Sequence, residues 1–231
     1  MVPGVRRFVI TIDGPAGAGK STVAKAVARR LGYRLLDTGA IYRALALAAR
    51  RQGTAWNDGE ALARLAAKLE VTLAGNEAGR PTVLLAGDDV TEAIRTPEIS
   101  QGASLVSAFP AVREALLALQ RQLAGQGGLV AEGRDMGTVV FPRAEIKLFL
   151  TARAEVRARR RYEEQRAGGS VVVEETVRRE MEERDERDRS RAVAPLRAAP
   201  DAVLVDTSEK TVEEVVDDVE RIARARLVPN G

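Results

Sequence analysis

The segment from Gly14 to Ser21 constrains the fold more than any other part of the chain. It reads Gly-Pro-Ala-Gly-Ala-Gly-Lys-Ser and fits the pattern G-x-x-x-x-G-K-[ST]. A short apolar run at residues 8–12 precedes it, and a helical pattern from about Lys20 to Leu31 follows it. Between a strand and a helix, the glycines of such a loop expose consecutive backbone N–H groups that wrap a phosphate chain. The segment therefore predicts a phosphate-binding loop in an α/β protein.

The same loop predicts an ATP site. We expect Lys20 to reach the β- and γ-phosphates and the hydroxyl of Ser21 to bind Mg²⁺. The sequence contains no N-K-x-D guanine signature, which favours ATP over GTP. The predicted ATP-binding residues are Gly14, Pro15, Ala16, Gly17, Ala18, Gly19, Lys20, Ser21 and Thr22.

Composition limits the chemistry that remains open. The 231 residues include no cysteine and no histidine, which excludes disulfides, thiolate metal sites and any histidine base. The cations are 31 arginines and 5 lysines, and this arginine excess fits either anionic ligands or a GC-rich genome. The net charge of only +3 argues against a nucleic-acid partner. No apolar run approaches the ~20 residues that span a bilayer, so we expect a soluble, cytoplasmic protein without a membrane partner.

Five short apolar segments predict the strands of one sheet. They cover residues 8–12, 35–36, 129–131, 146–150 and 202–205. Because helical patterns separate them, we predict an α/β fold with a doubly wound, five-stranded parallel sheet flanked by helices. Ligands bind beyond the carboxyl ends of such strands. Three of these ends carry polar clusters around glycine, at Asp13-Gly14, at Asp37-Thr38-Gly39 and at residues 132–135.

The remaining patterns predict helices and the domain organisation. Helices are expected at residues 20–31, 41–52 and 59–69, after the N-cap Thr96, from Pro110 to the glycines at 125–128, and after the capping box of Thr211 and Glu214. Residues 71–73 and 82–85, around a turn at 75–80, favour a hairpin. Residues 153–191 hold 12 arginines and 11 acids and predict two helices broken at Gly168-Gly169. We therefore divide the chain into a core of residues 1–69, 91–152 and 192–231, a small antiparallel insertion at 70–90 and a helical lid at 153–191.

Several longer segments carry a family resemblance. They are ITIDGPAGAGKST, LLDTGAIYR, EAIRT followed by VSAFPAVREALL, EGRDMGTVVFP and ERDERDRSRAVAPL. Together they resemble the bacterial cytidylate kinases, in the nucleoside-monophosphate kinase group of P-loop kinases. The resemblance implies a monomeric enzyme that transfers the γ-phosphoryl group of ATP, with Mg²⁺, to CMP or dCMP.

The resemblance also implies an acceptor site. Thr38, Tyr42 and Arg43 match positions that hold the phosphate and ribose side of the acceptor. Ser104 and Arg113 match positions that contact the cytosine ring. The alternative for Arg43 and Arg113 is that each lies on the solvent-exposed face of a helix.

Two further segments complete this implied site. Arg134 matches a phosphate-binding arginine, and Asp135 matches a carboxylate that reads the base. A carboxylate suits cytosine, whose N4 amino group donates, whereas the O4 of uracil would repel it. The alternative for Asp135 is a cap on the following turn. Arg184, Asp188 and Arg191 match residues near the lid that close over the sugar and base. The implied catalytic residues are Lys20, Arg134 and Arg184.

The lid arginines and the competing functions stay open. Most charges of residues 153–191 could form surface pairs at i,i+3 and i,i+4, so residues 157, 160 and 161 receive no individual role. One rival is another P-loop kinase, for thymidylate or for shikimate, whose hydroxyl would need a carboxylate such as Asp37. The other is a non-catalytic ATP-binding switch or a regulator of nucleic acid. Transfer between two phosphates needs positioning and charge neutralisation but no base, so a chain without histidine suffices.

Overall fold

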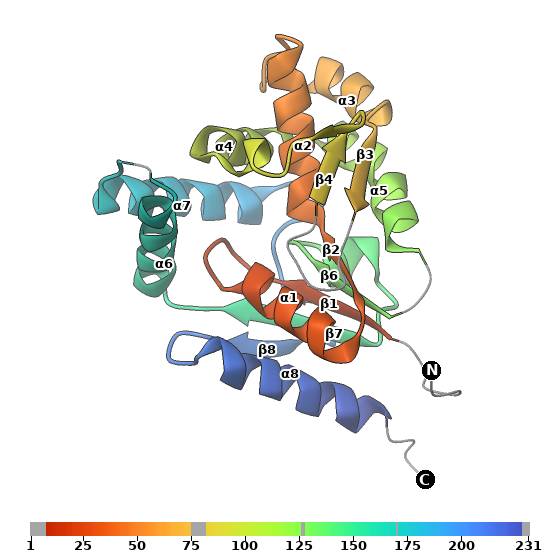
Figure 1. Ribbon diagram of the computed structural model, residues 1–231, viewed down its shortest axis with the longest axis vertical. Helices are drawn as coiled ribbons and strands as arrows, with labels where there is room; N and C mark the ends of the chain where they lie inside the picture. Colours follow the sequence, from red (N-terminus) through yellow and green to blue (C-terminus); the bar gives the residue numbers. More distant parts are fainter. Residues whose placement is uncertain (1–7, 75–81, 126–127, 170, 228–231) are drawn as a thin grey trace.

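The computed structural model describes residues 8–74, 82–125, 128–169 and 171–227. Five strands form one parallel sheet in the order β2-β6-β1-β7-β8 (Figure 1). They are β1 (Val9–Asp13), β2 (Arg34–Asp37), β6 (Leu129–Glu132), β7 (Ile146–Thr151) and β8 (Val203–Asp206). The central strands are buried on both faces, which explains why they read as continuous apolar runs. The predicted doubly wound sheet is confirmed.

Helices cover both faces of this sheet: α1 (Lys20–Leu31) and α8 (Val212–Leu227) on one, α2 (Thr38–Arg51) and α5 (Pro110–Ala124) on the other. The remaining helices pack mainly against other helices; they are α3 (Gly59–Ala67), α4 (Pro97–Val106), α6 (Ala154–Ala167) and α7 (Glu174–Ser190). One core cluster joins α1 and α8 to the sheet through residues such as Val27, Val219 and Leu148. A second cluster, which includes Leu45 and Leu116, joins α2 and α5 to the opposite face and extends to α3, α4 and the second sheet. In Figure 1, helices α2 to α5 and the second sheet lie above the main sheet.

The second sheet is antiparallel and has three strands rather than a simple hairpin. Its strands are β3 (Val71–Ala74), β4 (Thr82–Leu85) and β5 (Asp88–Asp89), in that order. The predicted pairing of the first two is confirmed, whereas the predicted turn at 75–80 lies outside the described residues. No sequence pattern predicts β5, because its two exposed aspartates are not apolar and pair with the sheet only through Leu84 and Leu85.

Three helix starts were predicted correctly from their N-cap residues. Asp58 and Thr96 cap α3 and α4, and Thr211 exchanges the expected bonds with Glu214. The predicted start of the 41–52 helix is wrong, because α2 begins at Thr38. The Asp37 carboxylate accepts a hydrogen bond from the Ala40 N–H at 3.0 Å, so the cluster predicted as a loop is the cap and first turn of a helix.

The two lid helices, α6 and α7, break at the predicted glycines and pack beside the phosphate loop (Figure 1). Their small apolar cluster of Ala158, Val177 and Met181 contacts Ala16 of that loop. Among the described residues, no single helix is long and apolar enough to cross a membrane; α4 and α5 meet the criterion only as a pair bent by 104°.

Candidate active site

Glycines shape the phosphate loop between β1 and α1. Gly14 has φ +145°, and a Cβ there would lie 2.0 Å from the carbonyl oxygen of Leu150. Gly17 and Gly19 adopt φ of +73° and +82°, in the region that L side chains rarely enter. No side chain of the described residues caps the start of α1, so the first N–H groups of this helix are available to an anion.

Lys20 lies buried at the base of this loop. Its Nζ donates to the Pro15 carbonyl at 2.6 Å. Burial lowers the pKa of Lys20, and the nearby Arg134 lowers it further, while Glu132 opposes them. A bound phosphate chain would supply the negative charge that stabilises this lysine in its protonated form.

Glu132, at the end of β6, is a site residue to which the sequence analysis gave no role. Ser21 Oγ donates to its Oε2 at 2.8 Å, while its Oε1 is buried without a hydrogen-bond partner. Burial raises the pKa of Glu132 to about 7, and Asp37, its neighbour in the β2–β6 register, contributes to the rise. The available signal was a carboxylate ending the strand that pairs with β1.

These oxygens fit the Mg²⁺ that a phosphate loop of this type uses. Hydroxyl and carboxylate oxygens, as presented by Ser21 and Glu132, are the hard ligands that Mg²⁺ prefers. In the described part of the chain, no group of three or more acidic side chains could hold a metal ion. Phosphate oxygens of ATP would therefore supply the remaining ligands.

One cleft of about 390 Å³ brings together most of the predicted acceptor residues. Nine lysine or arginine side chains and five carboxylates line it, and this excess of positive charge favours an anionic ligand. Lys20 and Ser21 of the phosphate loop are among its lining residues. The predicted acceptor residues in its lining are Thr38, Tyr42, Arg43, Arg113, Arg134, Asp135, Arg184, Asp188 and Arg191.

One wall of the cleft contains a buried ion pair. Arg113 Nη2 lies 2.5 Å from Asp135 Oδ2, and both side chains are at most 7% exposed. The guanidinium also lies over the ring of Tyr42, 5.5 Å from its centre. The alternatives of a solvent-exposed Arg113 and a capping Asp135 are therefore wrong, since no side chain caps the turn after Asp135. Arg43 likewise faces the cleft and pairs with Asp37 at 2.8 Å.

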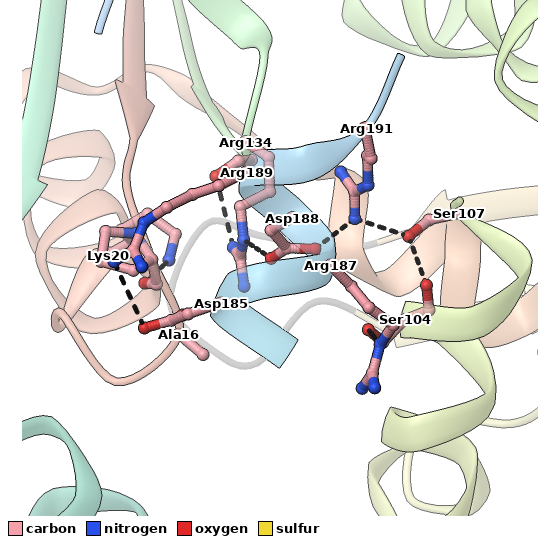
Figure 2. A network of polar contacts seen from close by, with 12 residues as sticks. Ala16, Lys20, Ser104, Ser107, Arg134, Asp185, Arg187, Asp188, Arg189 and Arg191 are labelled. Atoms are coloured by element: carbon pink, nitrogen blue, oxygen red, sulfur yellow. Dashed lines mark hydrogen bonds and ion pairs between the residues drawn. The ribbon is translucent and has the colours of Figure 1, made fainter. Parts of the chain in front are cut away.

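Asp188 connects the lid to this wall. Figure 2 shows its carboxylate between Arg134 and Arg191, and Arg134 Nε lies 2.8 Å from Oδ2. Arg191 Nη2 also donates to Ser107 Oγ at 2.9 Å. Burial would raise the pKa of Asp188, but Arg134 and Arg191 lower it to about 2. The end of α7 is thereby fixed to the loop after β6 and to the end of α4.

Two other arginines in the cleft form no ion pair with any described residue. Arg184 makes no hydrogen bond or ion pair with any described residue, and its Nε is buried. Burial lowers the pKa of Arg184 to about 9, with Arg134 as the next cause. Arg95, which the sequence analysis did not assign, also lines the cleft with an unpartnered Nε. Predicted Ser104 lies outside this cleft, beneath α7, where its Oγ accepts from Arg187 Nε at 3.4 Å.

A second cleft of about 410 Å³ lies between the phosphate loop, α6 and the start of α8. Arg160 and Arg161 line it, whereas Arg157 does not. Arg160 donates to the hydroxyl and the carbonyl of Thr207 at 3.0 and 2.7 Å. The two clefts share the stretch from Lys20 to Thr22 as well as Gly17. Of the predicted ATP-binding residues, Ala16 lines the first cleft, Ala18 and Gly19 line the second, and Gly14 and Pro15 line neither.

A P-loop at the carboxyl edge of a doubly wound sheet, flanked by two clefts, defines a nucleotide-binding protein of the P-loop class. Known proteins identify its family. A family model described as cytidylate kinase matches residues 10–225. The chain is 53% identical to the cytidylate kinase of Azotobacter vinelandii over 216 residues, covering 93% of this chain and 94% of that one. It is 54% identical to the cytidylate kinase of Desulfitobacterium hafniense, covering 93% and 91%. The chain belongs to the cytidylate kinase family.

A solved structure shows the same fold at low sequence identity. It is an uncharacterized protein from Eubacterium ventriosum, matched over 95% of this chain and 99% of that one with a TM-score of 0.54. At 13% identity this similarity concerns the fold alone.

Proposed function

We propose that this chain transfers the γ-phosphoryl group of ATP to CMP or dCMP, giving ADP and CDP or dCDP. The observation that carries the proposal is that the two clefts meet at Lys20 and Ser21. ATP bound from the Thr207 side would direct its terminal phosphate along the loop into the cleft that holds Asp135. Membership of the cytidylate kinase family supports the same reaction.

Cytosine recognition follows from the wall of the first cleft. Asp135 Oδ2 accepts from Arg113, and its Oδ1 accepts no hydrogen bond from the described residues. That oxygen is suited to the N4 amino group of cytosine, whereas the O4 of uracil would face a second acceptor. The Arg113–Asp135 pair holds the carboxylate in one orientation, so recognition requires little rearrangement.

The chain's own residues supply charge neutralisation and water exclusion. The acceptor phosphate is already anionic, so it attacks without a general base. Lys20, Arg134 and Arg184 surround the point where the clefts meet and would stabilise negative charge on the transferring group. When bound at Ser21 and Glu132, Mg²⁺ would add a positive charge at the phosphates. The lid helices, attached at Ala16 and Asp188, exclude water as a competing acceptor.

A coupled assay of ADP release tests the proposal, with CMP, dCMP, UMP, AMP and shikimate as acceptors. We expect CMP and dCMP to stimulate turnover most. Stimulation by shikimate alone would favour a shikimate kinase. Turnover that does not depend on any acceptor would favour an ATP-binding switch protein. Arg184→Ala should lower kcat about 100-fold, because it removes a donor to the transferring phosphate. Arg179→Ala, an exposed arginine on the same helix, is the matched control and should leave kcat unchanged.

We further infer a monomer that acts in the cytoplasm on small molecules alone, with neither nucleic acid nor membrane as a partner. The small net charge of +3 supports the absence of a nucleic-acid partner. Light scattering during size-exclusion chromatography tests the oligomeric state, and a mass near 50 kDa rather than 24.9 kDa would contradict it.

A further inference from the structure

Asp13 is a buried carboxylate that the proposed reaction does not use. It ends β1, directly before the phosphate loop, and is 4% exposed. It lines neither cleft. Its Oδ1 accepts from the Met136 N–H and its Oδ2 from the Gly137 N–H, both at 2.8 Å. In the described part of the chain, no side chain donates a hydrogen bond to it.

The two N–H groups belong to the turn that carries the acceptor-binding residues. Met136–Val140 forms a single π-helical turn, and Asp135 stands at its N-cap. An aspartate at an N-cap ordinarily accepts hydrogen bonds from the first N–H groups of its own helix. Here Asp135 makes no such bond, because its carboxylate is paired with Arg113. Asp13 satisfies these N–H groups from a different strand and leaves Asp135 free for the cleft.

Close packing links this turn directly to β1. A Cβ on Gly137 would lie 3.0 Å from Thr11 Oγ1 and 3.4 Å from Asp13 Oδ2. The absence of a side chain at Gly137 therefore lets the turn lie close to Thr11 on β1. The phosphate loop starts at Gly14, directly after Asp13. The hydrogen bonds from Asp13 to the turn at Met136–Val140 therefore set the distance between this loop and that turn.

We propose that Asp13 is a positioning residue of the acceptor site, an inference that rests on the proposed function. By capping the turn in place of Asp135, it keeps the Asp135 carboxylate available to Arg113 and to the base. It also fixes the position of Arg134, the residue before Asp135, relative to Lys20. Loss of the cap lets Asp135 turn back onto its own helix, so acceptor binding and base selectivity suffer while ATP binding does not.

The substitution Asp13→Asn tests this with almost no change in volume. The new amide offers one acceptor oxygen instead of two, so one buried N–H loses its partner. We expect the KM for CMP to rise about tenfold, and the preference for CMP over UMP to fall by a similar factor. The KM for ATP should stay within about twofold, since the phosphate loop makes no bond to Asp13. Asp58→Ala is the control, because it removes an N-cap remote from both clefts and should leave both KM values unchanged.

Two further variants keep the test decisive if Asp13→Asn does not fold or loses activity for another reason. Gly137→Ala presses the turn away from β1 and should produce the same rise in KM for CMP alone. In an Asp135→Ala background, Asp13→Asn should add little further loss of selectivity, because it acts through Asp135. The inference is wrong if folded Asp13→Asn keeps the wild-type KM for CMP, if both KM values rise equally, or if the two selectivity losses add. Absence of CMP-dependent ADP release by the unchanged chain would instead refute the proposed function, and the inference with it.

Discussion

The buried ion pair between Arg157 and Asp185 tests how the lid is attached to the phosphate loop. Arg157 Nη1 lies 2.6 Å from Asp185 Oδ2, and the two side chains are 7% and 5% exposed. The same guanidinium donates to the carbonyls of Ala152 and Ala16 at 3.0 and 3.1 Å. One arginine therefore joins α6, α7, the end of β7 and the phosphate loop.

The substitution Arg157→Met leaves Asp185 buried, and among the described residues its one remaining ion-pair partner is Arg189, at 3.9 Å. Removing one partner of a buried pair costs about 3–5 kcal/mol, because the remaining charge is left uncompensated. For a chain of this length each kcal/mol corresponds to about 2–4 °C, so Tm should fall by roughly 6–20 °C. The double change Arg157→Met with Asp185→Leu should recover most of this loss, since neither charge remains buried alone.

Thermal unfolding followed by circular dichroism measures these changes, and the coupled assay measures the KM for ATP. The double variant should regain Tm but keep a KM for ATP raised about tenfold, because the bond to the Ala16 carbonyl is not restored. Arg159→Met, which removes only an exposed pair with Glu163, is the control. A wild-type Tm for Arg157→Met, or a double variant no more stable than the single one, would refute this account of the pair.

Three other predictions follow from the site. Asp135→Ala should lower kcat/KM for CMP about tenfold more than for UMP, because it removes the acceptor for the N4 amino group; equal losses in the coupled assay would exclude base reading. Ser107→Ala removes the hydroxyl that accepts from Arg191 and should raise the KM for CMP about fivefold with kcat unchanged, whereas a fall in kcat alone would contradict a role in binding. Burial raises the pKa of Asp13 from 3.8 to about 6 against its two backbone hydrogen bonds, and Asp135 adds to the rise while Lys20 opposes it. Between these values the native state binds more protons than the unfolded state, so the free energy of unfolding falls as pH rises. Asp13→Asn should remove this decline in urea unfolding between pH 4 and 6.5, and parallel profiles of the two proteins would contradict it.

Local patterns were enough to predict the sheet and most of the helices. The buried strands are continuous apolar runs, and caps such as Asp58 and Thr96 act within their own helices. The misplaced start of α2 and the missing β5 have different origins. Asp37 is an equally local N-cap, but residues 37–39 were interpreted as a polar cluster at the end of a strand rather than as the start of a helix. In contrast, β5 depends on a neighbouring element, because it exists only where β4 offers an edge for pairing.

The site also contains residues that could be predicted from the sequence and residues that could not. Residues that the resemblance implied, such as Arg113 and Asp188, line the first cleft. Glu132 and Asp13 did not receive a role, because each acts through a partner more than 100 positions away, Ser21 or Gly137. Nothing in a single sequence reveals such a pairing before the strands are placed side by side.

Two arginines of the cleft, Arg134 and Arg184, should affect activity in the same direction but the stability of the folded chain in opposite directions. Arg134 shares Asp188 with Arg191, so Arg134→Ala leaves a buried carboxylate short of one partner and should lower Tm. Arg184 has no counter-ion among the described residues, and burial lowers its pKa to about 9, so its charge is a cost in the unliganded protein. Arg184→Ala should therefore raise Tm by about 1–8 °C while it lowers kcat. Both variants should lose activity in the coupled assay but move in opposite directions on thermal unfolding. A fall in Tm for both variants would mean that Arg184 stabilises the folded chain. It would contradict the interpretation that Arg184 stays unpaired until it binds the transferring phosphate.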